Sequence, residues 1–217
     1  SAASDVYKRQ ALRRGEGKLS NTGALVVTTG KYTGRSPKDK FIVDTPSVHD
    51  DIAWGSVNVP ITQEKFNAIR SKVIAYLQNR EIFIFDGKAG ADPVCTRKFR
   101  IINELASQNL FIHELLIRPT AEELENYGEA DFTIFVAPGF KCIPEIDGTH
   151  SEAAIIVDYE QKQVVICGSQ YSGEIKKSVF SVMNFLMPKE GVLPMHCSAN
   201  MDPETHETAV FLSLIHI

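Results

Sequence analysis

A loop near the start of the sequence concentrates groups that bind anions. Residues 29–40 (TGKYTGRSPKDK) combine two glycines, one proline and four cationic side chains. Glycine lets a backbone approach a ligand closely, and the planar guanidinium of Arg35 offers two parallel donors to a carboxylate or a phosphate. The alternative is a solvated basic turn, which composition alone favours. This loop is the first candidate site.

A second cluster, residues 170–177 (QYSGEIKK), opens a strongly amphipathic helix predicted over 174–187. Lys176 and Lys177 repel each other and lie near the positive end of the helix dipole, and both effects lower a lysine pKa. A neutral amine can ligate a metal, whereas a protonated amine cannot. The hydroxyl of Tyr171 belongs to the same candidate site. The alternative is a lysine pair on the wet face of the helix, which is the more common arrangement.

A third cluster, residues 194–200 (PMHCSAN), contains two potential metal ligands, His196 and Cys197. One such pair does not complete a tetrahedral site. Consecutive residues of a strand point to opposite faces, so at most one of the two is expected to face a given pocket. A lone histidine is more often structural. The sequence contains no G-x-x-x-x-G-K-[ST] motif, and so it has no recognisable cradle for a triphosphate.

Helix-like and strand-like segments alternate around these clusters, which predicts an α/β domain. A short polar connection between two of the strands predicts a hairpin, and the mixture of this hairpin with helix-separated strands predicts a mixed sheet. The predicted helices are 62–78, 97–106, a short one from 120, and 174–187; the predicted strands are 23–29, 40–43, 81–85, 132–136, 153–157, 163–167, 195–199 and 209–212.

Composition limits the classes of partner. The 217 residues carry 23 basic and 27 acidic side chains, which argues against a nucleic acid or an anionic membrane surface as partner. No apolar run approaches the roughly 18 residues of a membrane span. The four cysteines form no C-x-x-C pair, so we expect reduced thiols and a cytoplasmic protein.

Three segments taken together carry a family resemblance. TGKYTGRSPKDKFIV (29–43), YSGEIKKSVFSVMNFLMP (171–188) and MHCSAN (195–200), in this order, resemble the ATP-dependent phosphoenolpyruvate carboxykinases. The similarity runs from about residue 11 to residue 212. It implies a mixed-sheet N-terminal substrate domain over 11–191 and a stub of the P-loop nucleotide-binding domain over 192–212. Residues 1–10 and 213–217 do not continue the family pattern and are expected to be foreign or misread ends.

The resemblance also implies an activity. Enzymes of this family convert oxaloacetate and ATP to phosphoenolpyruvate, carbon dioxide and ADP in gluconeogenesis, using Mn²⁺ with Mg²⁺. By this resemblance Arg35 binds a substrate carboxylate and the departing carbon dioxide, and Tyr171 lines the substrate pocket. Lys177, as a neutral amine, would contact substrate, Mn²⁺ and the γ-phosphoryl group of ATP. His196 would be a second Mn²⁺ ligand near that phosphate, and Arg35, Lys177 and His196 would be the catalytic set.

The sequence leaves open whether these residues act as an enzyme, and it allows two other functions. Because the family's P-loop does not follow residue 212, we expect no turnover from these residues alone. A non-catalytic module that holds a dicarboxylate with the same cationic clusters is the alternative from a different class. The GTP-using carboxykinases are a further alternative, although KYTGRSPKDK and GEIKK favour the ATP-using branch.

Overall fold

The computed structural model describes residues 2–212, which divide into two compact units at Val179 and Phe180. Each unit is described by itself. The elements of the first unit are α1 (Ala2–Arg13), β1 (Gly17–Leu19), β2 (Leu25–Val27), β3 (Lys40–Val43), β4 (Val59–Ile61), α2 (Gln63–Leu77), β5 (Phe83–Ala89), β6 (Arg97–Asn103), α3 (Ala106–Leu115), α4 (Ala121–Glu125), β7 (Phe132–Ala137), α5 (Pro144–Asp147), β8 (Ala154–Asp158), β9 (Gln163–Cys167) and the first turns of α6 (Gly173–Leu186).

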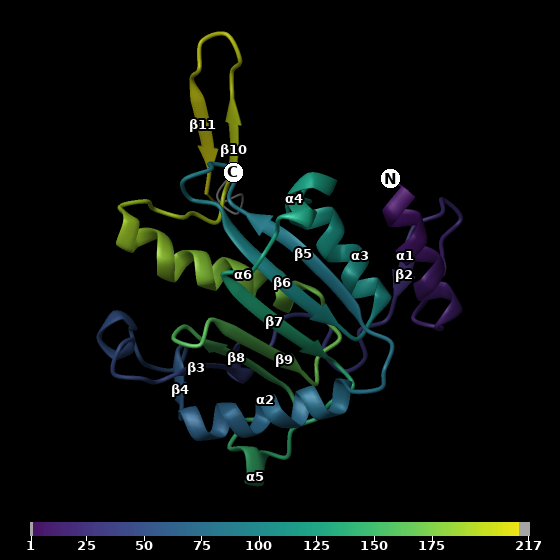
Figure 1. The fold of residues 1–217 in the computed structure, drawn as a ribbon, viewed down its shortest axis with the longest axis vertical. Coiled ribbons are helices and arrows are strands. Elements are labelled where there is room, and N and C mark those ends of the chain that lie inside the picture. Colours follow the sequence, from purple (N-terminus) through teal and green to yellow (C-terminus); the bar gives the residue numbers. More distant parts are fainter. Residues whose placement is uncertain (1, 213–217) are drawn as a thin grey trace. The chain divides into compact units, whose positions relative to one another are not determined.

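A seven-stranded mixed sheet in the order β4-β3-β8-β9-β7-β6-β5 forms the centre of the first unit (Figure 1). The pairs β3–β4, β3–β8, β6–β7 and β7–β9 are parallel, whereas β5–β6 and β8–β9 are antiparallel. The predicted hairpin is the β8–β9 pair, in which Asp158 is opposite Gln163. The predicted mixed α/β sheet is therefore confirmed.

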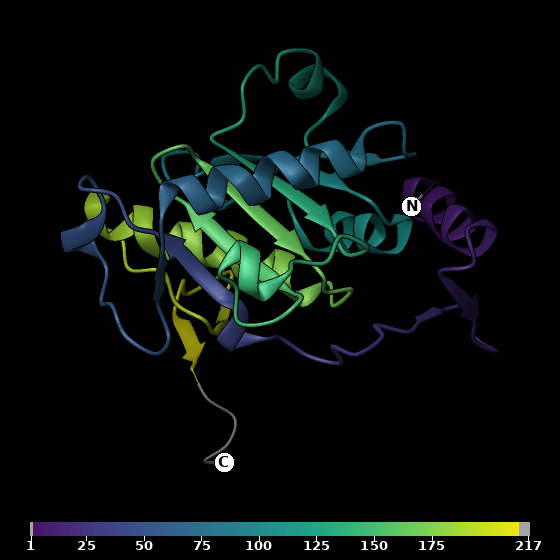
Figure 2. The same cartoon turned by 90° about the horizontal axis from the view of Figure 1, so that it is seen from below.

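Helix α2 covers one face of this sheet (Figure 2). Its start is set by Thr62, whose side chain accepts a hydrogen bond of 3.3 Å from the Lys65 amide. Phe66, Ile69 and Val73 follow at helical spacing and are fully buried. They pack against side chains of β3, β8 and β9, so the apolar periodicity of this segment correctly predicts both the helix and its buried face.

The prediction of a helix over residues 97–106 is wrong. Residues 97–103 form strand β6, in which Phe99, Ile101 and Asn103 are buried in alternation. The alternation follows from pairing with β5 on one side and β7 on the other. Strand β5 also continues past Asp86 to Ala89, where the sequence predicted a stop.

Helix α1 includes much of the N-terminal segment that was expected to be foreign. Tyr7 and Ala11 of this helix pack with Phe83 of β5 and Ala106 of α3. The corresponding expectation for residues 213–217 lies outside the described part of the chain.

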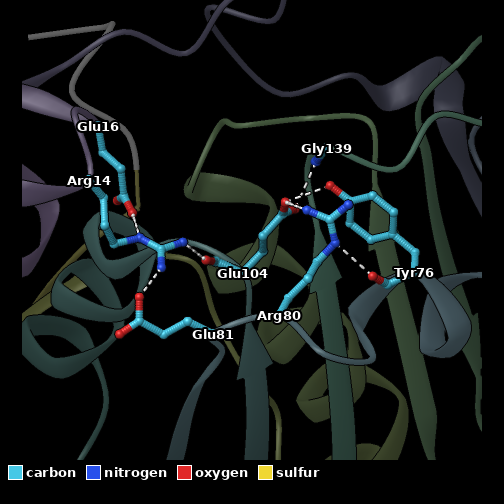
Figure 3. Close-up of polar contacts among 7 residues, drawn as sticks. All are labelled: Arg14, Glu16, Tyr76, Arg80, Glu81, Glu104 and Gly139. Atoms are coloured by element: carbon cyan, nitrogen blue, oxygen red, sulfur yellow. Dashed lines mark hydrogen bonds and ion pairs between the residues drawn. The ribbon is translucent and has the colours of Figure 1, made fainter.

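A hydrogen-bonded and ionic network joins segments around the ends of β6 and β7 (Figure 3). The Arg14 guanidinium contacts the Glu81 carboxylate at 2.5 Å and donates to the backbone carbonyl of Glu104 at 2.8 Å. The Glu104 carboxylate, which directly follows β6, accepts hydrogen bonds from the Tyr76 hydroxyl (2.6 Å) and the Gly139 amide (2.9 Å). These contacts tie α1 and α2 to one edge of the sheet.

Three loops that are far apart in the sequence meet at this edge of the sheet, where β6 and β7 end. Ala154, at the start of β8, is opposite Cys167, at the end of β9. Lys40, at the start of β3, is in register with Ile155. The segments before β3, before β8 and after β9 therefore meet at this edge. Two of them are the first and second predicted clusters.

The second unit begins with the rest of α6 and continues through a 3₁₀ turn (Met187–Glu190) to an antiparallel hairpin of β10 (Ser198–Met201) and β11 (Thr208–Phe211). The strand predicted from residue 195 begins only at Ser198. His196 and Cys197 therefore lie in a bend, and the strand alternation expected for them does not apply. Within residues 2–212, no helix is both long and apolar enough to cross a membrane.

Candidate anion-binding site

The loop that carries Arg35 is attached to the segment before β8. The Tyr32 hydroxyl lies 3.0 Å from the Ser151 hydroxyl, and the Lys31 amine lies 3.6 Å from the Glu152 carboxylate. Arg35 itself is exposed. The backbone of this loop is thus fixed to the sheet edge while its arginine remains accessible to a ligand.

A second attachment joins the loop to the first turn of α6. The Ser36 amide donates a hydrogen bond of 2.6 Å to the Glu174 carboxylate, and the Ser36 hydroxyl donates to the Asp39 carboxylate. Glu174 is only 6% exposed. Burial raises the pKa of the Glu174 carboxyl, while the Ser36 amide and the Arg35 charge act in the opposite direction.

Four cationic groups and one carboxylate form the electrostatic centre of the site. Partial burial lowers the pKa of Lys177, and the charges of Arg35 and Lys176 lower it further. The pKa of Lys40 is also lowered by burial and by Arg35, against the opposing effect of Glu174. The predicted direction for Lys177 is therefore the one found, with burial and Arg35 adding to the effect of the neighbouring lysine.

Tyr171 lies at the start of the helix that carries Lys177. A Cβ atom on Gly173 would be only 2.4 Å from Cε1 of the Tyr171 ring, so the absence of a side chain at Gly173 makes room for this ring. The Tyr171 amide donates to the Ser169 hydroxyl at 3.3 Å. Gly173 and Lys177 are four residues apart on α6 and hence share one side of the helix.

His196 belongs to the second unit, where it is exposed and its ring packs in a T-shaped arrangement with that of Phe180, with the centroids 5.5 Å apart. The predicted site residues thus fall into two groups, with Arg35, Tyr171 and Lys177 in the first unit. Within residues 2–212, no group of three or more His, Cys, Asp or Glu side chains is arranged to hold a metal ion.

Reasoning from the sequence gave no role to three residues of the site: Glu174, Gly173 and Lys40. Glu174 belongs to the second cluster, residues 170–177, but it had no role there, although its position beside the lysine pair is a signal. Gly173 precedes it, and nothing in the sequence indicates that the ring of Tyr171 occupies the space beside this glycine. Lys40 had been counted among the loop cations, without a place in the site.

The chain is thus an α/β protein with a group of cationic side chains at one edge of its sheet. Cationic side chains in such a position are suited to small anionic ligands. A family model described as phosphoenolpyruvate carboxykinase matches residues 2–215. The chain belongs to this family, as its three motifs predicted. The matched range includes residues 2–10.

Curated relatives carry the same family name. The chain is 66% identical over 205 residues to "Phosphoenolpyruvate carboxykinase (ATP)" of Fusobacterium nucleatum. It is 57% identical over 204 residues to "Phosphoenolpyruvate carboxykinase (ATP) 1" of Moorella thermoacetica and 53% identical over 206 residues to the Geobacillus thermodenitrificans protein. These matches cover 94% of this chain but only 38–39% of each relative, so the chain spans about two fifths of their length.

Proposed function

We propose that this chain is the substrate-binding part of an ATP-dependent phosphoenolpyruvate carboxykinase, which converts oxaloacetate and ATP to phosphoenolpyruvate, carbon dioxide and ADP. One observation carries the proposal beyond family membership. The 2.6 Å hydrogen bond from the Ser36 amide to Glu174 joins the loop of Arg35 to the first turn of α6, and the Arg35 charge lowers the pKa of Lys177 on that helix. This pairing suits a substrate that carries a carboxylate and reacts beside a metal-bound phosphate.

Each residue of the site then has a defined task. Arg35 binds a carboxylate of oxaloacetate and keeps the departing carbon dioxide oriented while the carbon–carbon bond breaks. Tyr171 lines the same pocket. Lys177, when deprotonated, would have a lone pair available for a metal and would contact the γ-phosphoryl group of a bound ATP.

Two nitrogen donors of the chain would supply part of the coordination shell of a divalent cation. Lys177, with its lowered pKa, and His196 would hold Mn²⁺, and both would lie near the phosphates of ATP, which enters with Mg²⁺. When bound, the metal supplies charge stabilisation for the enolate oxygen that forms on decarboxylation. The tasks of the chain itself are to present these two nitrogens and to orient the substrate through Arg35.

The finer organisation also belongs to this proposal. We assign residues 11–191 to the substrate domain and residues 192–212 to the start of a nucleotide-binding domain, with the P-loop outside this sequence. The assignment of residues 1–10 and 213–217 as foreign ends stays a prediction, although the family model includes residues 2–215. The cytoplasm remains the predicted compartment, in keeping with four free cysteines.

The test is an assay of phosphoenolpyruvate formation from oxaloacetate, ATP and Mn²⁺. We expect turnover from the full-length protein that carries this chain and none from these 217 residues alone. A full-length protein without turnover would contradict the proposal, as would clear activity of the isolated chain. Tight dicarboxylate binding by a full-length protein that lacks turnover would favour the binding module instead.

A further inference from the structure

Glu174 is a buried carboxylate whose position in the site was not expected. It is 6% exposed, and Arg35 and Lys40 both act on it electrostatically. A buried carboxylate is stable only when it is paired or hydrogen-bonded. Glu174 meets this condition with the 2.6 Å hydrogen bond from the Ser36 amide and with the nearby cations.

This hydrogen bond connects the two elements that carry the site. Ser36 directly follows Arg35, and Glu174 precedes Lys177 by three residues, which places both side chains on neighbouring positions of one helix surface. The bond therefore joins the loop that carries Arg35 (the arginine loop) to helix α6, which carries Lys177. The contacts of Tyr32 and Lys31 described above join the loop to the segment before β8 instead.

Ser36 is held by two acidic side chains. Its amide donates to Glu174, and its hydroxyl donates to Asp39, which is 3% exposed. Buried hydrogen bonds to ionised acceptors are shorter and stronger than neutral ones. The backbone next to Arg35 is thus fixed, although the arginine side chain itself is exposed.

We propose that Glu174 is a positioning residue for substrate binding: by holding the backbone of Ser36 against the first turn of α6, its carboxylate fixes Arg35 relative to Lys177. The inference rests on the proposed function for its consequence. Small displacements of a group that orients a substrate produce large losses of rate, so a buried anchor beside the arginine matters for activity. Glu174 itself need not touch the substrate.

Glu64 provides a matched control. Glu64 and Glu174 are each the second residue of a helix, α2 and α6, so both have the same relation to a helix dipole. Glu64 is exposed, whereas Glu174 is buried. Replacing each by alanine separates the loss of the Ser36 anchor from the general loss of a first-turn carboxylate.

The anchor is tested directly by amide hydrogen exchange at Ser36 in this chain. We expect Glu174→Ala to accelerate exchange at Ser36 at least about 10-fold, because the amide loses its acceptor. Glu174→Gln keeps an acceptor oxygen and is expected to retain most of the protection, and Glu64→Ala to retain all of it. If Glu174→Ala leaves the exchange rate of the Ser36 amide unchanged while circular dichroism shows an intact fold, Glu174 does not anchor the loop.

The positioning role is tested by the kinetics of the full-length protein. Glu174→Ala is expected to raise KM for oxaloacetate about 10-fold or more while KM for ATP changes less than about twofold, because the arginine loop and not the nucleotide site is disturbed. Glu174→Gln should recover most of this loss. Equal impairment of the Gln and Ala variants, or constants for Glu174→Ala that match those of Glu64→Ala, would overturn the role.

These results distinguish the inference from the proposed function. If the wild-type full-length protein does not turn over oxaloacetate, the proposed function fails, and the exchange at Ser36 alone decides whether Glu174 anchors the loop. If the wild type is active and the Glu174 variants behave like the Glu64 control, the proposed function stands and the positioning role is rejected.

Discussion

Arg35 and Lys177 act on each other electrostatically, although one comes from the loop before β3 and the other from helix α6. The Arg35 charge adds to the effect of burial in lowering the pKa of Lys177. A cation that lowers the pKa of a neighbouring amine makes that amine easier to deprotonate, and only the deprotonated amine has a lone pair for a metal. The Arg35 side chain is itself exposed.

Loss of Arg35 should therefore affect the two substrates unequally. In the full-length protein we expect Arg35→Ala to raise KM for oxaloacetate by about 10- to 100-fold, the scale of a lost charge-assisted hydrogen bond, and to change KM for ATP little. Steady-state kinetics with each substrate varied in turn provide the measurement. Lys38→Ala, which removes an exposed cation from the same loop, is the control. Equal losses for both substrates would contradict the carboxylate role.

The pKa of Lys177 itself can be measured by ¹³C NMR of methylated lysines in this chain. Removing a nearby positive charge favours the protonated amine, so Arg35→Met and Lys176→Met should each raise the pKa of Lys177. The rise should be greater for Arg35→Met, because Arg35 has the larger effect. Burial remains in both variants, so neither should restore the ordinary value.

Lys38→Met is the control for this titration and should leave the pKa of Lys177 where it is. A lowered or unchanged pKa of Lys177 in Arg35→Met would show that the two groups do not face each other. In the full-length protein, a raised pKa should weaken Mn²⁺ binding near pH 7, because protons then compete more strongly for the amine.

Gly173→Ala should separate stability from function. Alanine favours a helix over glycine by roughly 0.5–1 kcal/mol, so we expect urea unfolding to show little or no loss of stability. The new Cβ would lie 2.4 Å from Cε1 of Tyr171, however, and the ring must move. KM for oxaloacetate should therefore rise. Gly55→Ala, where a Cβ meets no atom within 4 Å, is the control; an unchanged KM in Gly173→Ala would argue against a role for the Tyr171 ring.

The contact between Tyr76 and Glu104 should make stability depend on alkaline pH. Burial, and then the hydrogen bond to Glu104, raise the pKa of Tyr76 to about 12. The protonated hydroxyl thus stabilises the folded state below the ordinary tyrosine pKa of about 10, and this contribution is lost as pH rises toward 12. Tyr76→Phe should lower the free energy of unfolding by about 1–2 kcal/mol at pH 7, and by less at pH 11.

Urea unfolding of the wild type and the Tyr76→Phe variant at both pH values provides the measurement. Tyr7→Phe, which removes a hydroxyl from α1, controls for the general effect of losing a phenol. A Tyr76→Phe deficit of the same size at pH 7 and pH 11 would show that the hydroxyl does not titrate as the contact requires.

Local patterns in the sequence predicted several elements correctly. The spacing of Phe66, Ile69 and Val73 indicates α2, and the short helix predicted from residue 120 is α4, where Thr120 and Glu123 form a capping box. Each of these signals involves residues within a few positions of one another. The failure at β6 has the opposite cause, because Phe99 and its neighbours are held in a strand by partners on both sides.

The site was predictable only as separate pieces. Motif resemblance indicated Arg35, Tyr171, Lys177 and His196, but the link through Glu174 was beyond local reasoning. Its partner Ser36 lies 138 positions away, and a glutamate in the first turn of a helix ordinarily signals only a favourable interaction with the helix dipole. Nothing local specifies which distant amide such a carboxylate accepts.

The most direct test of the anion site is an NMR titration of this chain with oxalate, a stable dicarboxylate. We predict that amide signals of residues 30–36 and 171–177 shift together, with a single dissociation constant, and that Arg35→Ala abolishes these shifts. Shifts confined to other parts of the chain, or an unchanged response in Arg35→Ala, would contradict the account.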